Sequence, residues 1–281
     1  MAVEVASRLG CDVISADSRQ IFRDIPVVSA APGPDEMRGV THHFVGTLPL
    51  DAYYSAARFE ADVTALLPRL FEKNPYAVMC GGSMMYVDAV TDGIDDLPDI
   101  SPEVRSYVGR LLESQGRAAV MAQLEVLDPR YAAEVDPANT KRVVHAVEIS
   151  LASGRPYSEL RLGRHAERPF DIIKVAICHD RDRLFARINR RVDDMVAKGL
   201  LDEARRLYPL RHLNSLNTVG LKELFAHFDG QMDLPAALAR IAKNTRVYAK
   251  KQIAWLARPS VRPAVMLPAD DSPARRILSM L

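Results

Sequence analysis

Apolar and polar positions along the chain alternate between helical and extended spacing. Residues 2–9 carry apolar side chains at helical spacing and are followed by Gly10, and the segment 11–15, with Val13 and Ile14 as its apolar residues, predicts a strand. A second helix is predicted over 53–74, and the apolar run 75–82, which ends in two glycines, predicts a buried strand. Helices and strands that follow one another at this pace predict an α/β fold with a parallel sheet flanked by helices.

This alternation stops at about residue 92. Helical spacing then recurs over 103–115, 117–126 and 140–153, and no strand is predicted between 103 and 162. The pattern therefore predicts an all-helical insertion domain over residues 92–168. We expect residues 1–91 and 169–281 to form one α/β core around it.

The second part of the predicted core begins with another strand. Apolar residues alternate within 170–180, and two helices are predicted over 181–198 and up to Leu207. A loop is predicted at 217–224 and a last long helix at 234–256.

Composition supports a globular enzyme. The chain has 281 residues, of which 48% are hydrophobic and 26% are charged, and it contains three cysteines without metal-ligand spacing. No run of 18 apolar residues is present, and the first residues lack the basic and apolar pattern of a signal peptide. We therefore expect a cytoplasmic protein that does not enter a membrane.

The formal charge of +1 hides an asymmetry between the two halves of the chain. Residues 1–140 hold 11 Lys and Arg against 21 Asp and Glu, a charge of −10, and the remainder holds 26 against 15, a charge of +11. A basic half of this size suits a polyanion such as RNA. Arginine-rich solvated helix faces would explain the same count.

Polar residues crowd the end of the first predicted strand. Asp17 directly follows this strand, and ligands of open α/β sheets bind beyond the carboxyl ends of the strands. An aspartate at this place is also a common turn former or helix cap. Gly81, Gly82 and Ser83 follow the next strand and form a turn that can bring backbone N–H groups to an anion, although two glycines often mark only a tight turn.

Two predicted helices carry basic stripes. Arg183, Arg187 and Arg191 recur every four residues and suit a diphosphate, unless nearby aspartates reduce them to surface ion pairs. The last helix interleaves basic residues with aromatic ones, which suits a nucleic-acid strand. Its aromatic residues, Tyr248 and Trp255, would also fit a core-facing position, Trp255 the more so.

Seven segments in this order resemble the tRNA dimethylallyltransferases, also called tRNA isopentenyltransferases or the IPP transferase family. They are ISADSRQIF, YSAARF, CGGSMMY, DPANTKRVVHAVE, RINRRVDDMVAKGLLDEARRL, NTVGLKEL and NTRVYAKKQIAWL. The resemblance implies a P-loop-NTPase-like fold and the transfer of a dimethylallyl group from dimethylallyl diphosphate to the exocyclic amine of adenosine 37, beside the tRNA anticodon. It implies tRNA as partner, recognised through its anticodon stem-loop, and Mg²⁺ as cofactor, and we expect a monomer.

The resemblance also implies roles for individual residues. Asp17 is expected to be the general base and Arg191 to stabilise the departing diphosphate. The residues expected to contact tRNA are Ser18, Arg19, Gln20, Ser83, Lys141, Arg142, His145, Asn217, Thr218, Gly220, Lys222, Lys250, Lys251 and Gln252.

One family feature has no counterpart in this sequence. Members of the family begin with a strand and a phosphate-binding loop that holds the diphosphate and Mg²⁺, whereas Met1 falls within the helix that should follow that loop. We expect the missing segment to lie upstream of Met1, which leaves the metal ligand unknown. A catalytically inactive tRNA-binding protein is the alternative, and a nucleotide kinase is disfavoured because no phosphate loop is present.

Overall fold

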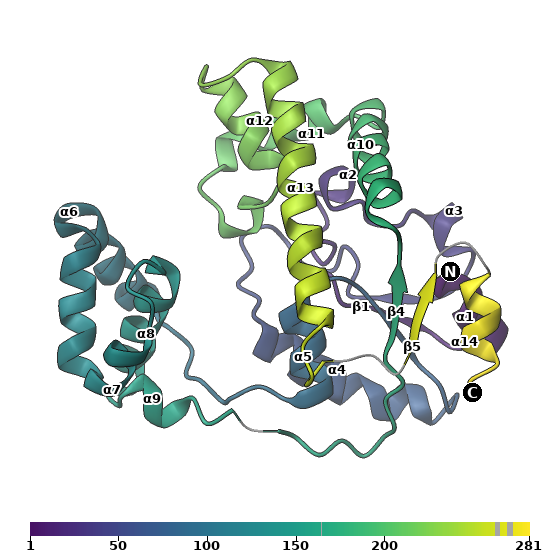
Figure 1. Cartoon of the computed structure of the whole chain (residues 1–281), viewed down its shortest axis with the longest axis horizontal. Coiled ribbons are helices and arrows are strands. Elements are labelled where there is room, and N and C mark those ends of the chain that lie inside the picture. The colour runs from purple at the N-terminus through teal and green to yellow at the C-terminus, as the bar shows by residue number, and fades with distance from the viewer. Residues whose placement is uncertain (164, 262–264, 269–271) are drawn as a thin grey trace. The chain divides into compact units, whose positions relative to one another are not determined.

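The structure is a computed structural model that describes residues 1–163, 165–261, 265–268 and 272–281 (Figure 1). The chain forms two compact units, and each is described by itself. The first consists of Met1–Thr91 and Arg168–Leu281, and the second of Asp92–Glu167, against the 92–168 predicted for the insertion. No helix within the described ranges is long and apolar enough to cross a membrane.

The strands of the first unit pair in parallel. β1 (Val13–Ser15) lies between β2 (His42–His43) and β3 (Val78–Cys80), with Val13 opposite both His42 and Val78. β4 (Val175–Cys178) pairs with β5 (Val265–Pro268) in a second sheet, which Figure 1 shows as two adjacent arrows. The prediction of an α/β fold with parallel strands is confirmed, although the strands are distributed over two sheets and β2 and β5 were not predicted.

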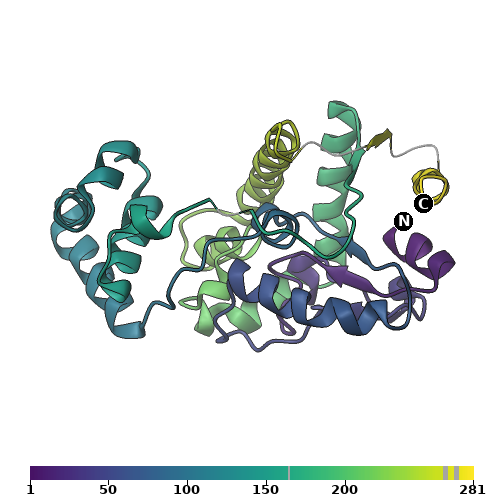
Figure 2. The same ribbon diagram turned by 90° about the horizontal axis from the view of Figure 1, so that it is seen from below.

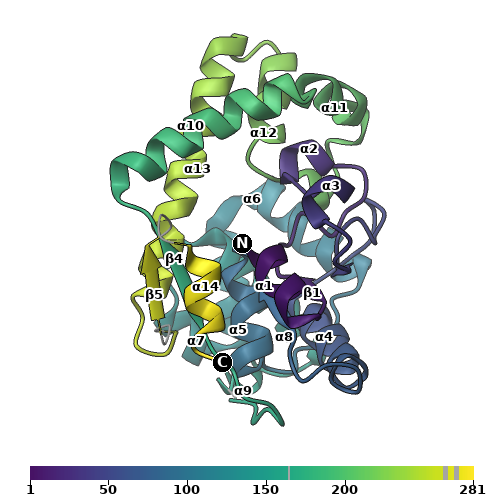
Figure 3. The same ribbon diagram turned by 90° about the vertical axis from the view of Figure 1, so that its right-hand side faces the viewer.

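The helices of the first unit are α1 (Ala2–Leu9), α2 (Pro26–Ser29), α3 (Pro34–Met37), α4 (Ala56–Phe71), α5 (Met84–Asp92), α10 (Arg181–Ala197), α11 (Leu200–Leu207), α12 (Leu221–Phe228), α13 (Leu234–Leu256) and α14 (Pro273–Leu278). The bounds of α1, α4, α10, α11 and α13 lie close to the predicted ones, whereas α2, α3, α5 and α14 were not predicted. Side chains of Ser55, Asp180 and Asp233 cap α4, α10 and α13, since each accepts a hydrogen bond from a first-turn amide. Figure 3 shows α14 beside α1.

The predicted loop at 217–224 was wrong in its second half, because α12 begins at Leu221. Gly220 precedes this helix, and its N–H donates to Oε2 of Glu223 at 2.7 Å. The other carboxylate oxygen of Glu223 accepts a hydrogen bond from the side-chain amide of Asn244, on α13, at 2.6 Å. A partner 21 residues away therefore helps to hold the glutamate that starts the helix.

The main core of the first unit lies between the segment that follows β1 and the helices α10 to α13. The segment contributes Ile21, Phe22, Ile25 and Val28, and the helices contribute a larger buried set: Val192, Met195, Leu200, Ala204, Leu207, Leu221, Leu224, Phe225, Ala237, Ile241 and Ala242. Residues far apart in the chain thus fix the loop after β1 against the C-terminal helices.

The second unit consists of helices in the part that the structure describes (Figure 2). They are α6 (Pro102–Leu127), α7 (Pro129–Glu134), α8 (Thr140–Ser153) and α9 (Tyr157–Leu160). Gly116 interrupts α6 with φ of 77°, which confirms the two separate helical patterns predicted on either side of it. The core of this unit joins Val108, Val120 and Leu124 of α6 to Val143 and Val147 of α8.

A buried carboxylate joins the loop after β1 to α11. Glu203 accepts hydrogen bonds from the N–H groups of Val27 at 2.9 Å and Val28 at 2.8 Å, in the first turn of α2. Burial raises the pKa of Glu203, and the hydrogen bonds from the two amides oppose this shift. Because α2 has no side-chain cap of its own, Glu203 satisfies two amides that would otherwise lack a partner.

Glu203→Gln should lower the free energy of unfolding by about 1 to 3 kcal/mol, because the new NH₂ group leaves one buried amide of α2 without an acceptor. Urea unfolding followed by circular dichroism measures this loss. Asp202→Asn is the matched control, since the side chain of Asp202 is 86% exposed and makes only a 3.8 Å ion pair with Arg205. An equal loss in both variants would contradict the role of Glu203.

The ends of β1 and β3 approach each other closely. The N–H of Ala16 donates to the carbonyl of Cys80 at 2.9 Å, and the N–H of Ser83 donates to the carbonyl of Ala16 at 3.1 Å. A Cβ atom at Gly81 would lie 2.2 Å from the carbonyl oxygen of Ala16. Only glycine allows this approach, because the atoms in the way belong to the backbone.

Gly81→Ala should therefore destabilise the first unit by about 3 kcal/mol, since the ends of both strands must move apart. Gly33→Ala is the control, because a Cβ at Gly33 meets nothing within 4 Å. The control should cost less than about 1 kcal/mol, the usual effect of losing a glycine N-cap. Thermal unfolding of both variants distinguishes a close backbone contact from a merely tight turn, for which the two losses would be alike.

Candidate active site

Asp17 organises the turn that follows β1. Its Oδ1 atom accepts hydrogen bonds from the N–H groups of Arg19 at 2.8 Å and Gln20 at 3.3 Å. This is the geometry of a turn-forming aspartate, so the interpretation of Asp17 as a turn former is confirmed. Within the described residues Oδ2 accepts no hydrogen bond, which leaves one carboxylate oxygen of a half-buried group available for a ligand.

Ser83 connects the two strand ends at the place where Asp17 lies. The N–H of Ser18 donates to Oγ of Ser83 at 2.8 Å, and that Oγ donates to Oγ of Ser18 at 3.1 Å. Ser83 is buried, with 9% of its surface exposed. The structure thus brings together the polar residues after β1 and after β3, as expected where carboxyl ends of parallel strands meet.

Arg19 and Gln20 turn toward the protein itself. Nη1 of Arg19 donates to the carbonyls of Ser215 at 2.8 Å and Asn214 at 3.3 Å, in the 3₁₀ turn Asn214–Leu216. Burial lowers the pKa of Arg19, and Tyr86 and Asp17 oppose this shift.

The side-chain amide of Gln20 also has partners within the protein. Nε2 donates to the carbonyl of Ala30 at 3.1 Å, and Oε1 accepts from Oγ of Ser15 at 2.9 Å. The contacts with tRNA expected of Arg19 and Gln20 stay predictions, and both side chains already brace the turn.

Tyr86 on α5 is a member of this cluster that was not singled out from the sequence. The residue is 6% exposed, and its ring stacks on that of Phe59 with ring centroids 4.3 Å apart. Burial raises the pKa of Tyr86 to about 12, while Arg19 lowers it and Asp17 raises it. The hydroxyl group therefore lies within electrostatic reach of the Asp17 turn. In the sequence, the position of Tyr86 one helical turn after Gly81-Gly82-Ser83 could have indicated that it lies near the site.

Helix α13 contacts the turn after β3. Nε2 of Gln252 donates to the carbonyl of Gly82 at 2.9 Å, and the hydroxyl group of Tyr248 donates to the same oxygen at 3.2 Å. One turn later, Nε1 of Trp255 donates to the carboxylate of Asp88, on α5, at 2.9 Å. Trp255 is half-buried and does not belong to the buried core, and its N–H has a partner.

The exposed basic residues of α13 and α10 lie on helices that pack together (Figure 1). Lys250 and Lys251 are exposed on α13, and Arg187 and Arg191 are exposed on α10. Arg183 lies 3.9 Å from Asp180, so part of the predicted arginine stripe does form a surface ion pair.

The predicted residues near α12 differ in exposure. Asn217 and Lys222 are exposed, Thr218 is half-buried and Gly220 is buried. Gly220 has φ of 104°, and a Cβ there would lie 2.4 Å from Cγ2 of Val28, so the position requires glycine.

Lys141, Arg142 and His145 are exposed on α8 of the second unit. Lys141 and Arg142 stand in its first turn, and Oδ1 of Asn139 accepts from the N–H of Arg142 at 3.4 Å to cap the helix.

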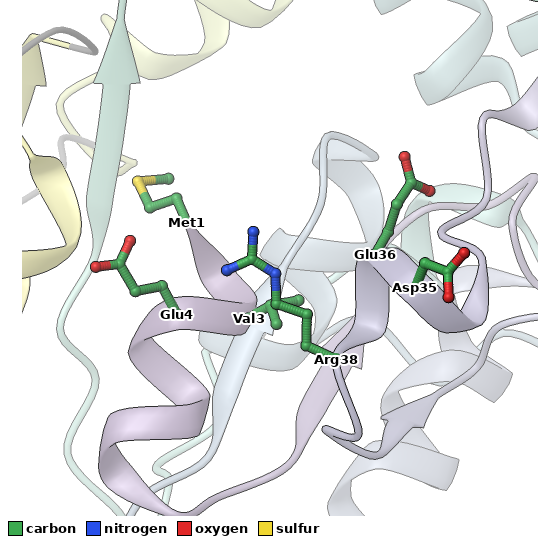
Figure 4. A pocket seen from close by; sticks show the side chains of 6 residues that line it. All are labelled: Met1, Val3, Glu4, Asp35, Glu36 and Arg38. Carbon is green, nitrogen blue, oxygen red and sulfur yellow. The ribbon is translucent and has the colours of Figure 1, made fainter.

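A pocket of about 360 Å³ lies away from these residues, at the start of α1 (Figure 4). Val3 and Glu4 of α1 line it together with Met1, which precedes that helix, and Asp35, Glu36 and Arg38 line it from α3 and the residue that follows. None of the residues predicted for catalysis or tRNA contact lines this pocket.

The chain is similar to known tRNA-modifying proteins over most of its length. "tRNA dimethylallyltransferase 2" of Parabacteroides distasonis is 52% identical over 258 residues, which cover 92% of this chain and 86% of that protein. "tRNA dimethylallyltransferase 1" of Phocaeicola vulgatus is 47% identical over the same shares.

Solved structures also match this chain over nearly its whole length. The full-length tRNA isopentenylpyrophosphate transferase of Bacillus halodurans is 31% identical with a TM-score of 0.68, and the match covers 99% of this chain and 88% of that one. A eukaryotic dimethylallyltransferase acting on tRNA matches with a TM-score of 0.82 at 22% identity, over 98% of this chain and 73% of that one, and shows the fold alone.

The matched family model is described as IPP transferase and matches residues 20–259. Its start at residue 20 and the coverage of the relatives do not support the expectation of a missing segment before Met1. A family model that spans most of the chain and a relative at 52% identity agree with the resemblance carried by the seven segments. The chain therefore belongs to the IPP transferase family.

Proposed function

We propose that the protein is a tRNA dimethylallyltransferase that joins a dimethylallyl group to the exocyclic amine of adenosine 37, next to the anticodon. The observation that carries this proposal is the available Oδ2 atom of Asp17, at a strand end where such ligands bind, in a chain of this family. Enzymes that act on a base hold it outside its stack, so the amine must reach this carboxylate in an extruded conformation.

The reaction forms one bond and breaks another. The amine nitrogen attacks the first carbon of the dimethylallyl group, and the bond from that carbon to oxygen breaks, so that diphosphate leaves with the electron pair. The proton of the amine passes to Oδ2 of Asp17 and then to solvent. Because Oδ1 stays bonded to two amides, the carboxylate keeps its orientation while Oδ2 accepts the proton.

The charge that grows on the departing diphosphate needs a cation. Arg191 is exposed on α10 and is the residue proposed for this role. The family resemblance implies Mg²⁺ as well. Among the described residues no three His, Cys, Asp or Glu side chains gather, but Mg²⁺ is commonly held by one or two carboxylates together with water and substrate phosphates, so the ion stays a prediction.

Exposed basic residues that are proposed to bind tRNA occur in each unit. Lys222, Lys250 and Lys251 are exposed in the first unit, and Lys141 and Arg142 in the second. Phosphate contacts of this kind supply affinity that falls steeply with salt. Recognition of the anticodon stem-loop by these residues, and action as a monomer in the cytoplasm, stay predictions.

Asp17→Asn separates the two tasks of the aspartate. The amide oxygen of asparagine can still accept from the N–H groups of Arg19 and Gln20, but it cannot take a proton at pH 7. The rate of a single turnover with saturating tRNA and donor should fall by about 10² to 10⁴, and the melting temperature should stay unchanged.

Asp24→Asn, in the same loop, is the control for that variant and should retain the full rate. An unchanged single-turnover rate in Asp17→Asn would refute the assignment of the base. Binding of tRNA by the wild type without any transfer from dimethylallyl diphosphate would instead favour the inactive tRNA-binding alternative.

Arg191→Ala should lower kcat/KM for dimethylallyl diphosphate by about 10² to 10³, because one cation is lost where charge develops in the transition state. Steady-state kinetics with varied donor and saturating tRNA measure the change. Arg190→Ala removes the adjacent exposed arginine of the same helix and should alter this value by less than about twofold. Equal effects of the two substitutions would count against a specific role of Arg191.

A further inference from the structure

Two side chains of α13 converge on one backbone atom of the turn after β3. The carbonyl oxygen of Gly82 accepts from Nε2 of Gln252 at 2.9 Å and from the hydroxyl group of Tyr248 at 3.2 Å. A Cβ atom at Gly82 would lie 2.3 Å from Nε2 of Gln252, so the glycine makes room for the amide. Helix α13 is thereby tied to the backbone of this turn.

The same turn holds the loop that carries Asp17. Oγ of Ser83 accepts from the N–H of Ser18 at 2.8 Å, and the N–H of Ser83 donates to the carbonyl of Ala16 at 3.1 Å. Asp17 therefore lies between two residues that are both bonded to Ser83. Any displacement of the Gly82-Ser83 peptide is passed to the carboxylate by two hydrogen bonds.

The position of Tyr248 supports this connection. Burial raises the pKa of its hydroxyl group, Asp17 raises it further, and Ser83 and Arg19 lower it. The hydroxyl group thus lies beside the residues that define the Asp17 turn, while 41% of the residue stays exposed. Gln252 is half-buried, in contrast to the exposed Lys250 and Lys251 that precede it on the same helix.

We propose that Gln252 and Tyr248 are positioning residues that act through the carbonyl of Gly82 and through Ser83 to hold Asp17 in place for proton transfer. This inference rests on the proposed function and deepens it. It gives Gln252, expected from the resemblance to contact tRNA, a task inside the protein. It also adds Tyr248 to the residues on which the reaction depends.

Gln252→Leu and Tyr248→Phe test the two donors, since each removes a donor and keeps a side chain of similar size and no charge. In Gln252→Leu the single-turnover rate at saturating tRNA should fall by about 10 to 10², as a misplacement of about 1 Å would cause. The dissociation constant of tRNA should stay within about twofold, because no charged phosphate contact is lost.

Tyr248→Phe should cause a smaller loss of rate, because its hydrogen bond is the longer of the two. The double variant should lose more than the product of the single losses, because only then does the carbonyl of Gly82 lack a partner. Val247→Ala is the matched control, since Val247 is 42% exposed on the same helix, and it should retain the wild-type rate.

Hydrogen exchange of the Ser18 amide supplies a readout that needs no activity. Exchange in the free protein should accelerate several-fold in Gln252→Leu and remain unchanged in Val247→Ala. Gly82→Ala should reproduce the effect of Gln252→Leu on rate and exchange, because the added methyl group displaces only the tip of a flexible side chain.

Four outcomes are distinguishable. Faster Ser18 exchange together with a slower single turnover and unchanged tRNA affinity supports the proposal. A weaker tRNA affinity with normal exchange and a normal rate at saturating tRNA overturns it and makes Gln252 a tRNA contact. If the wild type transfers no dimethylallyl group, the proposed function fails, whereas unchanged Ser18 exchange in both Gln252→Leu and Gly82→Ala still overturns the positioning role by itself.

Discussion

The placement of Asp17 depends on how closely the turn Gly81-Gly82-Ser83 approaches the end of β1. A Cβ at Gly81 would come within 2.2 Å of the carbonyl oxygen of Ala16, so the turn can reach this position only without a side chain. At this position the N–H group of Ser83 donates to the carbonyl of Ala16, and the N–H group of Ser18 donates to Oγ of Ser83. The carboxylate proposed as the general base is thus positioned by backbone packing together with the two amides that donate to its Oδ1.

Two other polar residues after β1 hold the turn in place. Arg19 and Gln20 donate to backbone carbonyls of Ser215 and Ala30, which fastens the turn to distant parts of the first unit. Buried polar groups are costly unless they are hydrogen-bonded, and here each of these side chains is. Within the described part of the chain Oδ2 of Asp17 accepts no hydrogen bond, and it is the atom proposed to accept the proton.

Local signals in the sequence predicted most of the longer helices and placed polar residues at the ends of two strands. Regular apolar spacing was enough for α13 and for the break of α6 at Gly116, because each depends on residues a few positions apart. The strands β2 and β5 were not predicted, because short strands depend on neighbouring strands for their stability and show little alternation of apolar and polar residues. The start of α12 was misplaced for a related reason, as Asn244 on another helix helps to hold Glu223.

For the site, the sequence by itself placed Asp17 and the turn Gly81-Gly82-Ser83 each directly after a predicted strand, where ligands of open α/β sheets bind. The sequence also identified the family, because the seven segments that resemble it consist of consecutive residues and can be recognised without a structure. Only the tertiary structure decided which side chains face these strand ends. Whether Gln252 points to solvent or to the carbonyl of Gly82 depends on the packing of α13 against a turn 170 residues earlier in the chain. The residues next to Gln252 in the sequence do not determine this packing.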